Sequence, residues 1–201
     1  MIQINFSGMK PFQDWIYQGH PEYAIFAVKA PIEIVGEMLV SDFEVKEWRK
    51  SVESDKSVGD TLPQARSHWI PVLQIANSNW TVVYWYVGAW TNLRSMCENL
   101  SSTLQSRVIF LGEEDTSGAI EYGIYEKGEQ LEIADWCPGE DLLFESSIRE
   151  EPEIDNFDIC EGEAISQSFN RIFLEEGLSI PSYEMKVSDA SLDRVDLMKL
   201  S

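Results

Sequence analysis

Histidine and cysteine are scarce in this chain of 201 residues. Of the two histidines, His20 lies between a glycine and a proline, and His68 lies directly before a tryptophan. Both positions favour surface or capping roles. A Ser-His-Asp or Cys-His catalytic site is therefore not indicated. The cysteines, Cys97, Cys137 and Cys160, include no C-x-x-C pair, so neither a zinc site nor a disulfide framework is expected.

Glycine-rich phosphate-binding motifs are absent as well. The chain contains neither G-x-x-x-x-G-K-[ST] nor G-x-G-x-x-G after a strand-like segment. We therefore predict no nucleotide, metal or other cofactor and no catalytic residue, although the abundant carboxylates leave a hard-cation site compatible with the composition.

Basic residues are few, with 15 against 35 acidic residues and a formal net charge of −20. This balance disfavours nucleic acids and anionic membranes as partners and permits a basic partner protein. The acids are concentrated in residues 113–163, which contain 18 acidic residues and only two basic ones, Lys127 and Arg149, and so carry a net charge of −16. Such a region is typical of a solvated face that keeps a protein soluble, and it is also where a basic partner would bind.

Long hydrophobic runs are missing too. The longest nearly apolar run covers residues 80–90, which is shorter than the roughly 20 residues that a membrane helix needs. The N-terminal residues lack the basic and then apolar regions of a signal peptide. Together with the cysteine usage, these features predict a cytoplasmic protein that does not span a membrane.

The patterns that are present predict an α+β fold. We expect a single domain over residues 1–201, with residues 1–21 as an irregular N-terminal arm, and a mixed sheet of five to seven strands with helices packed on it. Two hairpins are predicted, one around residues 77–79 and one around Lys127-Gly128. In the second hairpin, Ile120, Tyr122 and Ile124 should face the core with Leu131 and Ile133 opposite them, while Glu121 and Gly123 face outward.

Several helices are also predicted. The clearest apolar stripe follows a capping Thr91 and comprises Leu93, Met96, Cys97, Leu100 and Leu104. It lies between strand-like segments at residues 80–87 and 107–111, so a parallel β-α-β crossover is expected there. Further helices are expected from residue 31, at 42–51 and at 163–176. The C-terminal tail fits either a helix after Asp189 or an edge strand at 194–198.

One loop and one aromatic residue are the candidates for a binding site. The loop follows the 107–111 strand and consists of Glu113, Glu114, Asp115, Thr116 and Ser117. Adjacent acids and hydroxyls at the carboxyl end of a strand suit a cation or a basic side chain, although the same residues commonly build a tight turn. Trp90, just beyond a strand, is a candidate to line a pocket.

The sequence therefore favours a non-enzymatic protein, a binding, inhibitor-like or bacterial immunity-like protein that recognises a basic partner. The alternative is a small-ligand-binding protein or an enzyme that uses the loop carboxylates Glu114 and Asp115. The oligomeric state is not indicated by any pattern in the chain.

Overall fold

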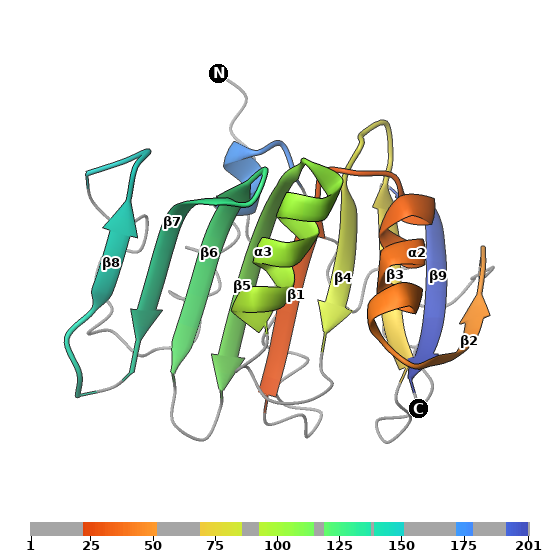
Figure 1. Ribbon diagram of the computed structural model, residues 1–201, viewed down its shortest axis with the longest axis horizontal. Helices are drawn as coiled ribbons and strands as arrows, with labels where there is room; N and C mark the ends of the chain where they lie inside the picture. Colours follow the sequence, from red (N-terminus) through yellow and green to blue (C-terminus); the bar gives the residue numbers. More distant parts are fainter. Residues whose placement is uncertain are drawn as a thin grey trace, which may run out of the picture.

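The computed structural model describes residues 22–51, 69–85, 93–114, 119–137, 139–150, 172–178 and 192–200. These residues form one nine-stranded sheet with the strand order β2-β9-β3-β4-β1-β5-β6-β7-β8 (Figure 1). The strands are β1 (Glu22–Val28), β2 (Val45–Arg49), β3 (Trp69–Ile75), β4 (Thr81–Trp85), β5 (Arg107–Glu114), β6 (Ile120–Glu126), β7 (Glu129–Trp136), β8 (Leu143–Ser146) and β9 (Leu192–Leu200). The helices that accompany them are α2 (Ile32–Asp42) and α3 (Leu93–Leu104).

The predicted mixed sheet of five to seven strands with a parallel crossover is wrong. Each neighbouring pair of the nine strands is antiparallel. Strands β4 and β5, on either side of α3, do run in the same direction, but β1 lies between them and is antiparallel to both. The predicted β-α-β unit requires β4 and β5 to be neighbours, but β1, an earlier segment of the chain, lies between them.

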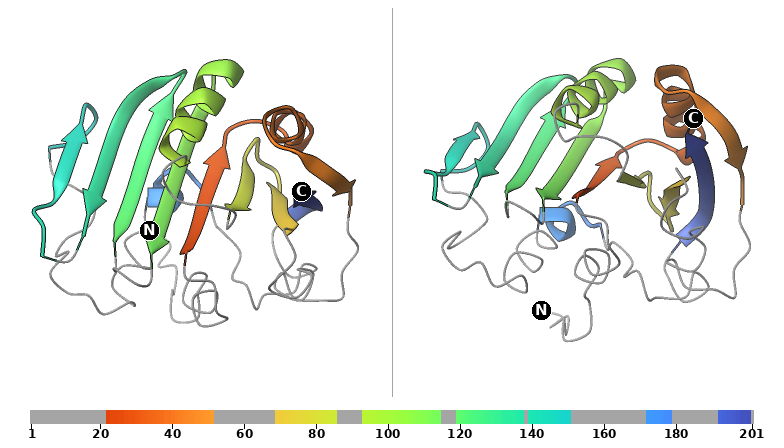
Figure 2. Two further views of the ribbon diagram at one scale, coloured as in Figure 1. Left: turned by 60° about the horizontal axis from the view of Figure 1, so that its bottom comes forward. Right: turned by 90° about the horizontal axis from the view of Figure 1, so that it is seen from below.

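Both faces of the sheet are buried in its central strands, whereas the outer strands β2 and β8 are partly exposed. Helices α2 and α3 cover one face, and the short segment 172–178 lies on the other (Figure 2). Along β1, Phe26 and Val28 belong to the core under the helices, whereas Ile25 and Ala27 belong to the core on the opposite face. Alternate residues of a strand point to opposite faces, so burial on both sides requires the nearly continuous apolar run of β1.

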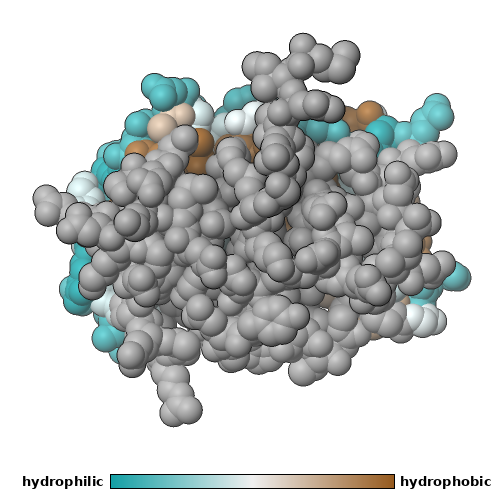
Figure 3. Space-filling view, turned by 180° about the vertical axis from the view of Figure 1, so that it is seen from behind, coloured by the Kyte–Doolittle hydropathy of each residue, from teal (hydrophilic) through white to brown (hydrophobic). Residues whose placement is uncertain are grey.

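The opposite face carries its own apolar cluster, which includes Tyr84, Tyr122, Phe173 and Leu178. Seen from this side, the described residues that remain visible lie at the margins of the face, and many of them are hydrophilic (Figure 3). The helical turn at residues 172–175 is the described part of the helix predicted at 163–176, and Gly177 follows it with φ +74°, as expected for a helix stop.

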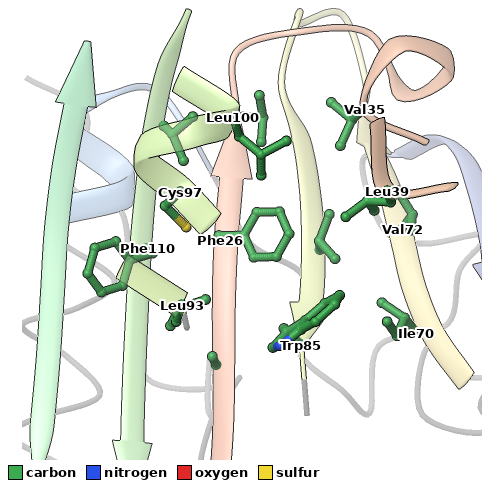
Figure 4. Packing of buried hydrophobic residues seen from close by; sticks show 14 of the residues in the cluster. Phe26, Val35, Leu39, Ile70, Val72, Trp85, Leu93, Cys97, Leu100 and Phe110 are labelled. Carbon is green, nitrogen blue, oxygen red and sulfur yellow. The ribbon is translucent and has the colours of Figure 1, made fainter. Parts of the chain in front are cut away.

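The core beneath the helices confirms the predicted stripe of α3. Leu93, Cys97 and Leu100 are buried against Phe26 and Phe110 (Figure 4). Ser101 on the same helix is also buried; its hydroxyl donates to the carbonyl of Ser106 at 2.7 Å and accepts from the backbone N–H of Gly128 at 3.0 Å. Helix α3 is thus attached to the turn between β6 and β7.

Two further segments form strands: residues 42–51, which were predicted as a helix, and the C-terminal tail, for which a helix and an edge strand were both predicted. Residues 42–51 contain β2, and the tail contains β9, which lies between β2 and β3 and is not the edge strand that was one of the two predictions. The indole N–H of Trp48 in β2 donates to the fully buried carboxylate of Asp196 in β9 at 2.8 Å. A Cβ on Gly36 of α2 would collide with the same indole, so this glycine makes room for it. Contacts of this kind, between residues far apart in the sequence, determine whether a segment forms a helix or a strand when its apolar spacing fits both.

The hairpin at Lys127-Gly128 is confirmed, since both residues have positive φ angles of 55° and 86°. The hairpin of β3 and β4 around residues 77–79 is confirmed as well. The predicted arm, residues 1–21, lies outside the described part of the chain. Within the described residues, no helix is long and apolar enough to cross a membrane.

Candidate functional site

The structure places the predicted binding loop only in part. Glu113 and Glu114 are the last two residues of β5, where Glu113 is opposite Ile120 of β6 and both are paired with β1. They are therefore strand residues and not loop residues, because β1 and β6 extend the pairing of β5 on both sides. Asp115, Thr116 and Ser117 lie outside the described residues, as does Trp90, so the predicted binding role of this loop stays a prediction.

A second acidic region is described in full except for residue 138, and we call residues 129–150 the acidic end of the sheet. It comprises β7, β8 and the segments that flank β8. Five acids here are exposed and Asp135 is half exposed, with 48% of its side chain accessible. The exposed acids are Glu129, Glu140, Asp141, Glu145 and Glu150.

The acidic end has a single basic residue, Arg149, and this residue is paired with a buried acid. Its Nε lies 2.6 Å from Oε2 of Glu132, whose side chain is 0% exposed. The Tyr122 hydroxyl donates to Oε1 of Glu132 at 2.9 Å, and the Ser146 hydroxyl donates to Oε2 at 2.8 Å. Because the charges of Glu132 and Arg149 compensate each other, the charge of this end is determined by the five exposed acids and, in part, by Asp135, which Arg94 of α3 also contacts.

The opposite end of the sheet has a different character. Strand β2 and the residue after it expose Lys46, Arg49 and Lys50, while Glu47 forms an ion pair with Arg49 at 2.7 Å. The exposed Asp42 and Glu44 precede the strand, so acids and bases balance at this end. The negative charge of the described chain is therefore not spread evenly along the sheet but increases towards β8.

A further ion-pair cluster connects α3 with the acidic end. Arg94 donates from Nε to Oε1 of Glu121 at 2.6 Å, and its Nη2 lies 3.5 Å from Oδ2 of Asp135. Glu121 and Asp135 are directly opposite each other on β6 and β7. Arg94 therefore connects the helix to two adjacent strands and partly neutralises the two acids.

Burial changes the proton affinities in this cluster. Glu121 is only 7% exposed, so burial raises the pKa of its carboxyl, an effect that Arg94 partly offsets. Burial, together with the nearby Glu121 carboxylate, raises the pKa of the Cys97 thiol. Burial also raises the pKa of Tyr125 to about 12. These are groups of a packed interface, and Cys97 is not an activated nucleophile.

The α3 side of β8 combines charge with an exposed apolar residue. Leu143 is 47% exposed and lies opposite Asp135, and the exposed Glu145 lies opposite Ile133. This small surface offers carboxylates for cationic groups and an apolar contact between them. The described residues contain no group of three His, Cys, Asp or Glu side chains that could hold a metal ion.

The sequence predictions for this region are partly wrong, for two separate reasons. The pairing of β6 with β7 shifts by one residue, since Tyr125 is opposite Gln130 but Ile124 is opposite Glu132. The shift turns Glu132, and not Ile133, towards the face of Tyr122. Glu121 and Gly123 do lie on the face opposite to Tyr122, as predicted, but this face is covered by α3 and not exposed to solvent; Glu121 is nearly buried, and Ile133 is opposite Gly123.

Three features of this end were missed by the sequence analysis: the buried Glu132 with its partners, the Arg94 cluster and the exposed surface at Leu143. The one signal for Glu132 in the sequence was its place between the apolar Leu131 and Ile133. In a regular strand this place indicates a residue that faces outward, and only the bulge turns it inward. Comparison of the chain with protein-family models, curated proteins and solved structures finds no match.

Proposed function

We propose that this protein is a non-enzymatic, inhibitor-like or immunity-like binding protein that recognises a basic partner protein through the acidic end of its sheet. The observation that carries this proposal is the concentration of exposed acids within residues 129–150, where Arg149, the one basic residue of that range, is already paired with the buried Glu132. A surface of this kind has carboxylates available for lysine and arginine side chains of a partner.

The electrostatic consequence is fast, salt-sensitive association. A local field of one sign steers an oppositely charged partner and raises the association rate, and screening by salt removes this advantage. At the β2 end acids and bases balance and provide no comparable field, so the field also orients the encounter.

The test is a pull-down from a lysate of the source cells with two variants of equal net charge. One variant reverses three exposed acids of the acidic end, as Glu140→Lys, Asp141→Lys and Glu145→Lys. The control reverses three exposed acids in and directly after α2, as Glu37→Lys, Asp42→Lys and Glu44→Lys. We expect a basic protein to be recovered with the wild type and the control at low salt, and to be lost with the acidic-end variant and at raised salt.

Three results would contradict the proposal: recovery of no partner, a partner that is retained unchanged at raised salt, and a partner that the acidic-end variant retains. The alternative of a ligand site or enzyme built on loop carboxylates depends on Asp115, which is outside the described residues. It stays a prediction from the sequence.

A further inference from the structure

Strand β8 is an edge of the sheet that the described residues form. It is the outermost strand at the acidic end, and in the part of the chain that the structure describes it pairs with β7 alone (Figure 1). An edge strand presents backbone N–H and C=O groups that can pair with a strand of another chain. The residues of β8 that present them follow from its pairing with β7.

The backbone N–H of Ser147 donates to the carbonyl of Leu131 at 2.8 Å. In an antiparallel pair, residues that are hydrogen-bonded to the neighbouring strand alternate with residues that are not. With Ser147 bonded to β7, Glu145 and Leu143 are the next residues that bond to β7. The N–H and C=O groups of Phe144 and Ser146 therefore point away from β7.

The two sides of β8 differ chemically. Leu143 and Glu145 lie on the α3 side, where Asp135 is the neighbour across the strand. Phe144 lies on the other side, half-buried against the apolar cluster of that face. Residues of an added strand lie on the same side as the residues they are paired with. An added strand thus meets carboxylates on its α3 side and an aromatic ring on its other side.

The edge is also held in place before any partner binds. The hydroxyl of Ser146 donates to the buried Glu132, and the Ser147 N–H bonds to β7, so both the side chain and the backbone at the end of β8 are fixed. A preorganised edge does not lose this conformational entropy on binding, which favours affinity.

We propose that β8 accepts, in antiparallel pairing, a strand of the basic partner in which cationic residues alternate with apolar ones. The cationic residues lie on the α3 side near Glu145 and Asp135, and the apolar residues lie beside Phe144. This inference rests on the proposed function and adds the mode of recognition to it. All described strand pairs of the sheet are antiparallel, so an antiparallel partner strand continues the same arrangement. Antiparallel pairing also aligns hydrogen bonds better than parallel pairing.

The test uses a short peptide of alternating lysine and valine as the probe, with affinity measured by calorimetry. In the proposed pairing, the residues opposite Phe144 and Ser146 are the valines, and their N–H groups point to β8. We expect backbone N-methylation of the valines to weaken binding about tenfold or more, because each methyl group removes a hydrogen bond of the ladder. N-methylation of the lysines should leave the affinity within about twofold, since those N–H groups point away from β8.

Equal binding of the unmethylated peptide and the valine-methylated peptide would overturn strand addition while leaving recognition of a basic partner intact. A loss caused by lysine methylation instead would overturn the antiparallel arrangement. Failure of the unmethylated peptide to bind would count against both proposals.

A matched pair of single variants tests the position of the edge. Glu145→Lys should weaken binding of the unmethylated peptide about tenfold, and Glu37→Lys on α2 should leave it unchanged. The protein alone should sediment as the same species at all concentrations tested. An assembly that Glu145→Lys abolishes would mean that a second copy occupies β8, and it would overturn the proposal.

Discussion

Arg149 and Glu132 form an ion pair in which Nε lies 2.6 Å from Oε2 and the acid has no exposed side-chain surface. The pair joins the segment after β8 to the middle of β7, and Arg149 also lies 3.5 Å from Glu175 in the segment 172–178 on the same face. The acidic end is therefore built around one compensated buried charge, with the accessible acids outside it.

Removing the buried acid should destabilise the protein strongly. Glu132→Gln leaves the largely buried guanidinium of Arg149 with Glu175, 3.5 Å away, as its carboxylate neighbour. Loss of one partner of a buried pair costs about 3–5 kcal/mol, and the contact with Glu175 places the expected loss at the lower end of this range. Urea denaturation measures this as a lower free energy of unfolding. The control Glu145→Gln, on the exposed side of β8, should change it by no more than about 0.5 kcal/mol. Equal midpoints for the two variants would contradict the role given to Glu132.

The raised pKa of Glu121 predicts a pH dependence of stability. The native protein holds a proton on Glu121 at pH values where the unfolded chain has released it, so the free energy of unfolding falls as the pH rises from the ordinary value of 4.5 through the raised value. Glu121→Gln does not titrate. The wild type should therefore lose stability relative to this variant across that window.

The measurement for Glu121 is denaturant unfolding of both proteins at several pH values below and above this window. The groups that interact with Glu121 are Arg94, Asp135, Cys97 and Tyr125, and the substitution leaves all four in place. A stability difference that stays constant, or that grows in favour of the wild type as the pH rises, would be inconsistent with a raised pKa.

Gly123 should not tolerate a side chain. A Cβ at this position would collide with the ring of Phe110, which also stacks on Tyr125 with centroids 6.2 Å apart. We expect Gly123→Ala to lower the free energy of unfolding by about 1–3 kcal/mol through overpacking. In a Phe110→Leu background the cost should shrink, which a double-mutant cycle detects. An equal cost in both backgrounds would mean that the ring is not the cause.

Cys97 should react with thiol reagents only after the protein unfolds. The thiol is fully buried and its pKa is raised, so few thiolates are present and access is closed. In a variant with Cys137→Ser and Cys160→Ser, labelling of Cys97 by a maleimide should follow the unfolding rate as urea is added. Rapid labelling under native conditions would show that the α3 side of the core opens locally.

The sequence was informative where local patterns and burial agree. The stripe of α3 and the turn at Lys127-Gly128 were predicted correctly, because a helical period and a glycine with positive φ act within a few residues. The sheet was not, because the insertion of β1 between β4 and β5 joins segments that are far apart in the chain. The spacing of apolar residues in the sequence does not indicate that β1 pairs with both β4 and β5.

The site was predicted less well for a similar reason. A single extra residue in β7 reverses the direction of Glu132 and Ile133, and an alternating pattern alone does not indicate where a bulge lies. The concentration of acids was visible in the sequence, but the compensation of Arg149 by Glu132 was not, since it depends on this reversal.

The most direct test of the central claim is the affinity of the lysine–valine peptide for the two triple variants that carry equal net charge. Recognition at the acidic end predicts that Glu140→Lys, Asp141→Lys and Glu145→Lys together weaken binding about tenfold or more relative to the control with Glu37→Lys, Asp42→Lys and Glu44→Lys. Equal weakening by both variants would mean that net charge alone attracts the peptide, and it would contradict a binding surface at β7 and β8.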